Sequence, residues 1–149
     1  MLVHDHSKTI KIILSALSLM IGGLIYLSFR TKELVMFTWV RYLGLEHEID
    51  KLRIALSGTH LPEFIVYCLP NALWVISYLL AADSLIDHNR HKIVWTTSLP
   101  LSAAILEGGQ FVHLIPGTYD SLDLLCILTP LIIYTIYYHK TKHHYEKTN

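Results

Sequence analysis

A carboxylate and a carboxamide lie three residues apart in an otherwise apolar segment of the chain. Glu107 and Gln110 occur in the sequence Leu-Glu-Gly-Gly-Gln-Phe-Val-His, and His113 follows after three more residues. In a helix this spacing places the three side chains in a slanted polar stripe. Because a carboxylate inside a membrane is costly, Glu107 indicates a functional site and is the candidate acid or base if that site is catalytic. Gly108 and Gly109 are expected to let a second helix approach the stripe closely.

Two aspartates open the next apolar segment. Asp120 and Asp123 are three residues apart. Asp120 is suited to cap the N-terminus of a helix, and Asp123 falls in its first turn, where the helix dipole favours a negative charge. Two interpretations remain open: capping alone, or capping together with membership of a site that includes Glu107.

Asn71 is a further candidate because of its depth. Asn71 lies about eight residues from the start of a predicted membrane helix at residues 63–82. Glu107 lies about eight residues from the end of another, at residues 93–115. These two helix ends are predicted to lie on the same outer side of the membrane, so both side chains are roughly 12 Å deep. We therefore expect Asn71 to be a hydrogen-bonding partner of Glu107. The alternative is that Asn71 only joins helices.

Long uncharged segments position these residues. The 149 residues are 52% apolar and 16% charged, with a formal net charge of zero. This composition argues against a disordered chain, a nucleic-acid binder with a broad basic surface and an ordinary soluble enzyme. The clustering of charge predicts an all-α polytopic membrane protein that forms one domain, residues 1–149. Four transmembrane helices are predicted, at about residues 12–29, 63–82, 93–115 and 122–138.

The connection between the first two predicted spans, residues 30–62, is too long for a simple turn. Apolar residues recur in it at helical spacing and are interleaved with charged residues in its second half. We expect one or two amphipathic helices that lie on the outer leaflet or cap the bundle. Gly44 and Gly58 are expected to interrupt the helical segments. The apolar residues that carry this prediction are Val35, Met36, Trp39, Val40 and Leu43, then Leu45, Ile49, Leu52 and Leu56.

Lysines and arginines predict the orientation of the spans. Seven of them fall on the side that carries the two termini and five on the opposite side. By the positive-inside rule, both termini face the cytoplasm.

The remaining polar and sulfur-containing residues receive simpler interpretations. Cys68 and Cys126 lie in apolar runs without metal-binding spacing, so two buried free thiols are favoured over a disulfide. Asp83 lies near the inner end of the second span and is expected, with Asp87, to pair with Arg90 or Lys92. No metal or other cofactor is predicted.

The acidic motif has a family resemblance. Glu107-Gly-Gly-Gln110, followed by Pro116-Gly117-Thr118-Tyr119-Asp120-Ser121-Leu122-Asp123, resembles the VanZ-like family of small bacterial membrane proteins, over roughly residues 61–138. The resemblance implies a multi-pass protein of the bacterial cytoplasmic membrane, in a family whose founding member is associated with glycopeptide resistance. It marks Glu107, Gln110, Asp120 and Asp123 as the motif positions and candidate catalytic residues. Asn71 and His113 are added to these as candidate ligand-binding residues.

Three functions are compatible with these features. The first is binding or modification of a cell-envelope component, lipid-linked or glycan-linked, at a polar intramembrane site near the outer leaflet. Whether such a protein is an enzyme stays open. The second is a small transporter or transporter subunit that uses Glu107 as a proton or cation site and forms a homo-oligomer. The third is a structural membrane partner protein. In each case the lipid bilayer is the surrounding partner, and no nucleic acid is expected.

Overall fold

The computed structural model describes the backbone of residues 2–86, 91–116 and 119–148, and in these residues it contains helices and no strands. The all-α prediction is confirmed. The elements are α1 (Leu2–Phe29), α2 (Val35–Tyr42), α3 (Glu46–Ala55), a π-helical turn η1 (Phe64–Cys68) that leads directly into α4 (Leu69–Leu85), α5 (Lys92–Phe111) and α6 (Ser121–Thr148).

Three helices of the described chain are long and apolar enough to cross a membrane: His6–Phe29, Phe64–Leu85 and Ser121–Thr141. They correspond to the first, second and fourth predicted spans. The predicted third span, 93–115, corresponds to α5, which ends at Phe111 and carries hydroxyl and carboxyl side chains along its length. That α5 crosses the membrane is therefore still a prediction.

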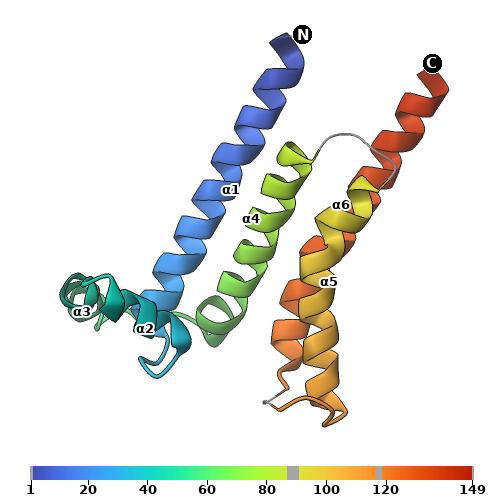
Figure 1. The fold of residues 1–149 in the computed structure, drawn as a ribbon. Helices are drawn as coiled ribbons and strands as arrows, with labels where there is room; N and C mark the ends of the chain where they lie inside the picture. The colour runs from blue at the N-terminus through green and yellow to red at the C-terminus, as the bar shows by residue number, and fades with distance from the viewer. Residues whose placement is uncertain (1, 87–90, 117–118, 149) are drawn as a thin grey trace.

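The four long helices run alternately up and down. Helix α4 lies at the centre, with α1 along one side and the antiparallel pair α5 and α6 along the other (Figure 1). The start of α1 and the end of α6 lie at the same end of the bundle, whereas α2 and α3 lie at the opposite end. Buried side chains of α4, α5 and α6 form the apolar core: Val75, Leu79, Ala104, Ile127, Leu131 and Tyr134.

Small residues allow α1 to pack closely on α4. A Cβ atom at Gly22 would lie 3.0 Å from the ring of Trp74 and 3.2 Å from the Cβ of Leu73. The hydroxyl of Ser15 donates to the carbonyl of Ser77 over 2.8 Å. Such small residues and hydroxyl groups hold helices together where lipid leaves no hydrophobic drive for association.

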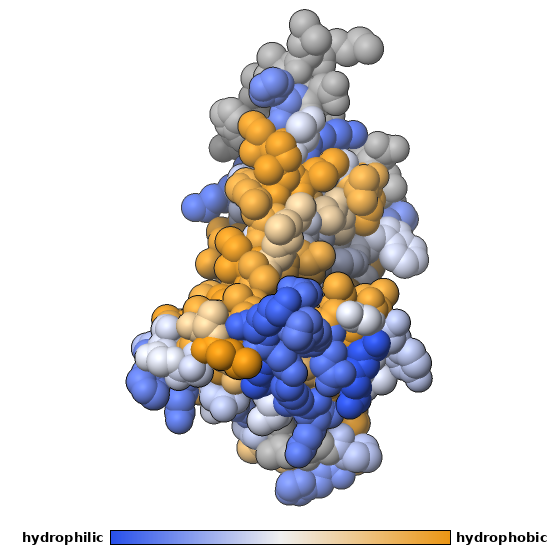
Figure 2. All heavy atoms as spheres, turned by 90° about the vertical axis from the view of Figure 1, so that its left-hand side faces the viewer, coloured by the Kyte–Doolittle hydropathy of each residue, from blue (hydrophilic) through white to orange (hydrophobic). Residues whose placement is uncertain are grey.

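The outward face of α1 is strongly apolar. Ile13, Leu17, Met20 and Leu24 are 48–61% exposed. Figure 2 shows a hydrophobic band across the middle of this side of the molecule and a hydrophilic patch below it. Exposure of such a continuous apolar surface to water is unfavourable. The band is therefore of the kind that lies in the hydrocarbon core of a membrane.

The connection between α1 and η1 forms the two predicted helices, α2 and α3. Only Val40 of the apolar set predicted in α2 is buried, and Phe37 lies beside it in the interior. Val35 and Trp39 are 70% and 63% exposed, so this part of the apolar set does not pack on the described helices. Arg53 ties α3 to the end of α1, since its Nη1 donates to the carbonyls of Leu27 and Arg30 over 2.7 and 2.9 Å.

Candidate functional site

The turn between α5 and α6 gathers three carboxylates. Asp120 caps α6 as predicted, because its Oδ1 accepts the N–H of Leu122 over 2.8 Å. Asp123 lies in the first turn of α6, also as predicted. Glu107 of α5 is half-buried, and its Oε1 accepts the backbone N–H of Asp120 over 2.9 Å. The carboxylate of Glu107 therefore faces the acidic turn and not bare lipid.

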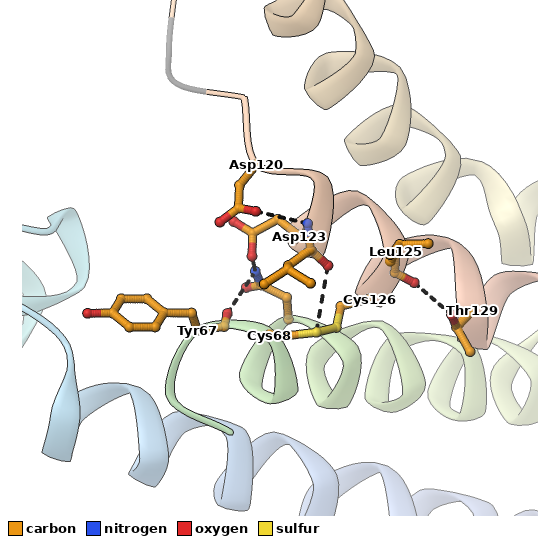
Figure 3. The surroundings of a disulfide bond; sticks show 9 residues. Tyr67, Cys68, Asp120, Asp123, Leu125, Cys126 and Thr129 are labelled. Carbon is orange, nitrogen blue, oxygen red and sulfur yellow. Dashed lines mark hydrogen bonds between the residues drawn. A yellow bond between two sulfur atoms is a disulfide. The ribbon is translucent and has the colours of Figure 1, made fainter. Parts of the chain in front are cut away.

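This arrangement resembles a capping box shared between two helices. In a capping box, an acidic residue three positions after the cap accepts the N–H of the cap residue itself. Asp123 occupies that position, but Glu107 supplies the bond from the neighbouring helix. Asp123 is thereby free to reach α4, where its Oδ1 accepts Nδ2 of Asn71 over 2.7 Å (Figure 3). The partner of Asn71 is thus Asp123, so the predicted pairing of Asn71 with Glu107 is wrong, whereas the alternative that Asn71 joins helices agrees with this bond between α4 and α6.

The structure brings together four of the six predicted site residues. The carboxylates of Asp120 and Glu107 repel the negative charge of Asp123, whereas the guanidinium of Arg30, in the segment after α1, attracts it. Gln110, the fifth candidate, is half-buried one turn beyond Glu107, and its carboxamide makes no hydrogen bond with any described residue.

His113 does not belong to a helical stripe. Helix α5 ends at Phe111, and His113 is exposed with a φ of 59°. The N–H of His113 bonds to the carbonyl of Gln110 and that of Leu114 to the carbonyl of Gly109, which is the Schellman pattern of a helix end. The stripe prediction for His113 fails because the helix stops before it.

The two glycines of the motif also have another role than expected. A Cβ atom at Gly109 would lie 2.6 Å from Cδ1 of Ile115, in the chain that returns over the helix end. Apart from the chain neighbours and backbone of its own helix, no described atom lies within 4 Å of a Cβ placed at Gly108. Gly109 therefore accommodates the following loop and not a second helix.

A disulfide joins Cys68 to Cys126 beneath the acidic turn, with Cα atoms 5.8 Å apart (Figure 3). The prediction of two free thiols is wrong. Each cysteine lies four or five residues inside the outer end of its predicted span, and this equal depth is the signal that could have indicated the bond. Cys68 is the last residue of the π-helical turn η1, and Asn71 follows in the first turn of α4, directly after Pro70.

An apolar groove of about 250 Å³ is lined by residues of α4, α5 and α6. Asn71 lines it, so one residue belongs both to the groove and to the acidic turn. The apolar lining includes Trp74, Val75, Leu99, Ala103 and Ile127. No sequence signal indicated this groove, because it depends on how α4 and α5 are paired.

A second polar cluster lies at the opposite end of the bundle, around the buried Asp83. Lys92 Nζ donates to the backbone carbonyl of Asp83 over 2.6 Å and lies 3.0 Å from its Oδ1. Lys11 Nζ lies 2.5 Å from Oδ2, and the hydroxyl of Tyr134 donates to Oδ1 over 2.9 Å. The predicted pairing with Lys92 is confirmed, whereas Asp87 and Arg90 lie outside the described residues. Sequence reasoning missed Lys11 and Tyr134, which come from α1 and α6.

The acidic turn offers acceptors and one free amide to a ligand. Carboxylate oxygens of Asp120 and Asp123 can accept N–H or O–H groups, and the carboxamide of Gln110 can both donate and accept. Within the described residues, no three His, Cys, Asp or Glu side chains are arranged to hold a metal ion. No family model, curated protein or solved structure matches the chain.

Proposed function

We propose that the chain is a four-helix membrane protein that binds a lipid-linked component of the cell envelope at the end opposite its termini. In this proposal α5 crosses the bilayer beside α6. Val94, Leu99 and Ile105 are 58–63% exposed on α5 and would face lipid. The exposed Val35 and Trp39 of α2 would lie in the membrane interface.

The disulfide supports an orientation with the acidic turn outside. Disulfides persist in oxidising compartments and are rare in the cytosol. The bond between Cys68 and Cys126 lies at the end of α4 and α6 that is remote from the termini. This agrees with the distribution of lysine and arginine, which predicts that both termini lie in the cytoplasm.

The observation that carries the proposal is the continuity of groove and acidic turn through Asn71. A hydrocarbon chain in the groove would bring its polar end to Asp123 and Asp120. The resemblance of residues 107–123 to the VanZ-like family supports an envelope ligand at the same positions.

Blocking the groove tests the proposal. Leu99 lines the groove and is 58% exposed, so a tryptophan there should fill the groove without disturbing the core. In vesicles containing a phospholipid with a photoreactive group in its acyl chain, we expect Leu99→Trp to reduce cross-linking to α4 and α5 severalfold.

Leu101→Trp is the matched control, since Leu101 is 48% exposed on the same helix but does not line the groove. Its cross-linking should equal that of the wild type. Equal labelling of all three proteins would contradict a lipid chain in the groove.

A structural role is the second candidate, because Glu107 already bonds to the backbone of Asp120. Glu107→Gln retains an acceptor oxygen but removes the charge, whereas Glu107→Leu removes both. If the charge serves a ligand, we expect Glu107→Gln to keep the wild-type unfolding temperature and to lose lipid retention. If the role is structural, Glu107→Gln behaves as wild type and only Glu107→Leu unfolds early, which the same two measurements detect.

A further inference from the structure

The guanidinium of Arg30 is a cation that lies against two aromatic rings. It lies 4.7 Å from the ring centroid of Tyr67 and 5.5 Å from that of Tyr26. Within the described chain it makes no side-chain hydrogen bond or ion pair, whereas Arg53 and Arg41 both donate to oxygen atoms. Stacking on aromatic faces holds a guanidinium in place and leaves its N–H edge directed outward.

Short contacts through Tyr67 and Asn71 connect Arg30 to Asp123. The guanidinium stacks on the ring of Tyr67, and Nδ2 of Asn71 donates both to the carbonyl of Tyr67 over 3.4 Å and to Oδ1 of Asp123 over 2.7 Å. Among the described residues, Arg30 and Asp123 form no ion pair. Asp123 is instead bonded to the neutral carboxamide of Asn71. A cation and a carboxylate held apart in this way are complementary to a ligand that carries both an anion and a cation.

Arg30, Asp120 and Asp123 lie at the ends of apolar helix segments, where lipid headgroups are found in a membrane. The apolar segment of α1 ends at Phe29, one residue before Arg30, and that of α6 begins at Ser121, beside Asp120 and Asp123. Phosphate groups of lipids lie at such helix ends. The ring of Tyr26 also packs on Trp74, with centroids 5.1 Å apart, and Trp74 lines the groove.

We infer that the lipid bound at this site is a phospholipid with a primary ammonium headgroup of the phosphoethanolamine type. Arg30 binds its phosphate, and Asp123 with Asp120 accepts its ammonium group. This inference rests on the proposed function and assigns Arg30 as the residue that selects the headgroup. Arginine suits the role because its planar fork matches phosphate oxygens in a bidentate manner.

Lipid retention measured by native mass spectrometry tests the inference. The probes are phosphatidylethanolamine and phosphatidylglycerol, each presented in phosphatidylcholine nanodiscs. We expect the wild type to retain phosphatidylethanolamine in preference to phosphatidylglycerol. Loss of a charge-assisted bond in Arg30→Gln should lower retention of phosphatidylethanolamine about tenfold. Asp123→Asn should remove the preference for phosphatidylethanolamine, since both lipids keep their phosphate contact with Arg30.

The matched control is Arg41→Gln, because Arg41 is exposed and its guanidinium donates only to Thr38 among the described residues. It should retain lipids as the wild type does. Unchanged retention in Arg30→Gln, together with loss in Leu99→Trp, would reject the assignment of Arg30 and leave the groove in place. Unchanged retention in Leu99→Trp as well would reject the proposed function itself.

Discussion

Replacing Asp83 with leucine is expected to lower the unfolding temperature of the detergent-purified protein by about 10 °C, for a loss of about 3–5 kcal/mol. Asp83 is 9% exposed and accepts from Lys11 of α1, Lys92 of α5 and Tyr134 of α6. Because it belongs to α4 itself, one carboxylate joins all four long helices. Its removal leaves the amine of Lys92, in a residue that is 7% exposed, without its carboxylate partner.

The origin of the penalty can be tested with a second substitution. Breaking a buried ion pair is costly mainly because the remaining charge is stranded, and removing that charge as well relieves the cost. The double variant Asp83→Leu/Lys92→Met should therefore unfold at a higher temperature than Asp83→Leu alone. Lys11 needs no such change, since its side chain is 27% exposed and can turn toward water.

Asp50 provides the control for a pair that is not buried. It contacts Lys32 over 2.5 Å, but the two side chains are 37% and 48% exposed. Asp50→Leu should cost less than about 1 kcal/mol, because water screens exposed pairs. Identical unfolding temperatures for Asp83→Leu and the wild type would show that the cluster does not hold the helices together.

The sequence predicts local features of this molecule better than contacts between helices. The apolar helices and the cap at Asp120 follow from charge-free runs and from one residue type at one position. The partner of Asn71 could not be predicted in this way, because depth alone does not say which neighbouring helix its side chain faces. The same limit explains why Lys11 and Tyr134, which lie 72 and 51 residues from Asp83, were missed.

His113 shows a different limit. Its spacing from Gln110 fits a helix, yet the chain leaves the helix two residues earlier and folds Ile115 over Gly109. A glycine pair within a helical pattern is compatible with close packing of another helix and with a helix end. Only the path of the following loop, which spacing does not encode, decides between them.

Removing the disulfide is expected to destabilise the protein by at most about 4 kcal/mol, because the bond closes a loop of many residues in the unfolded chain. Cys68 and Cys126 are 58 residues apart, and both are buried. A destabilisation of the full value, about 4 kcal/mol, would require an unfolded state that is a random coil. Helices that stay inserted in detergent or lipid gain less conformational entropy on unfolding, so the loss should be smaller. The double variant Cys68→Ser/Cys126→Ser should therefore unfold at a lower temperature than the wild type.

The same bond should also influence the site, because Asn71 and Asp123 each lie one turn from a bonded cysteine. Without the bond, the ends of α4 and α6 can separate, and the hydrogen bond between these two residues weakens. We expect the double serine variant to lose part of its phosphatidylethanolamine retention even at temperatures where it is folded. A reductant should bring the wild type to the level of this variant and leave the variant itself unchanged. Two free thiols, counted by maleimide mass-tagging of the unreduced, denatured wild type, would show that the bond does not form and would remove this explanation of how α4 is held to α6.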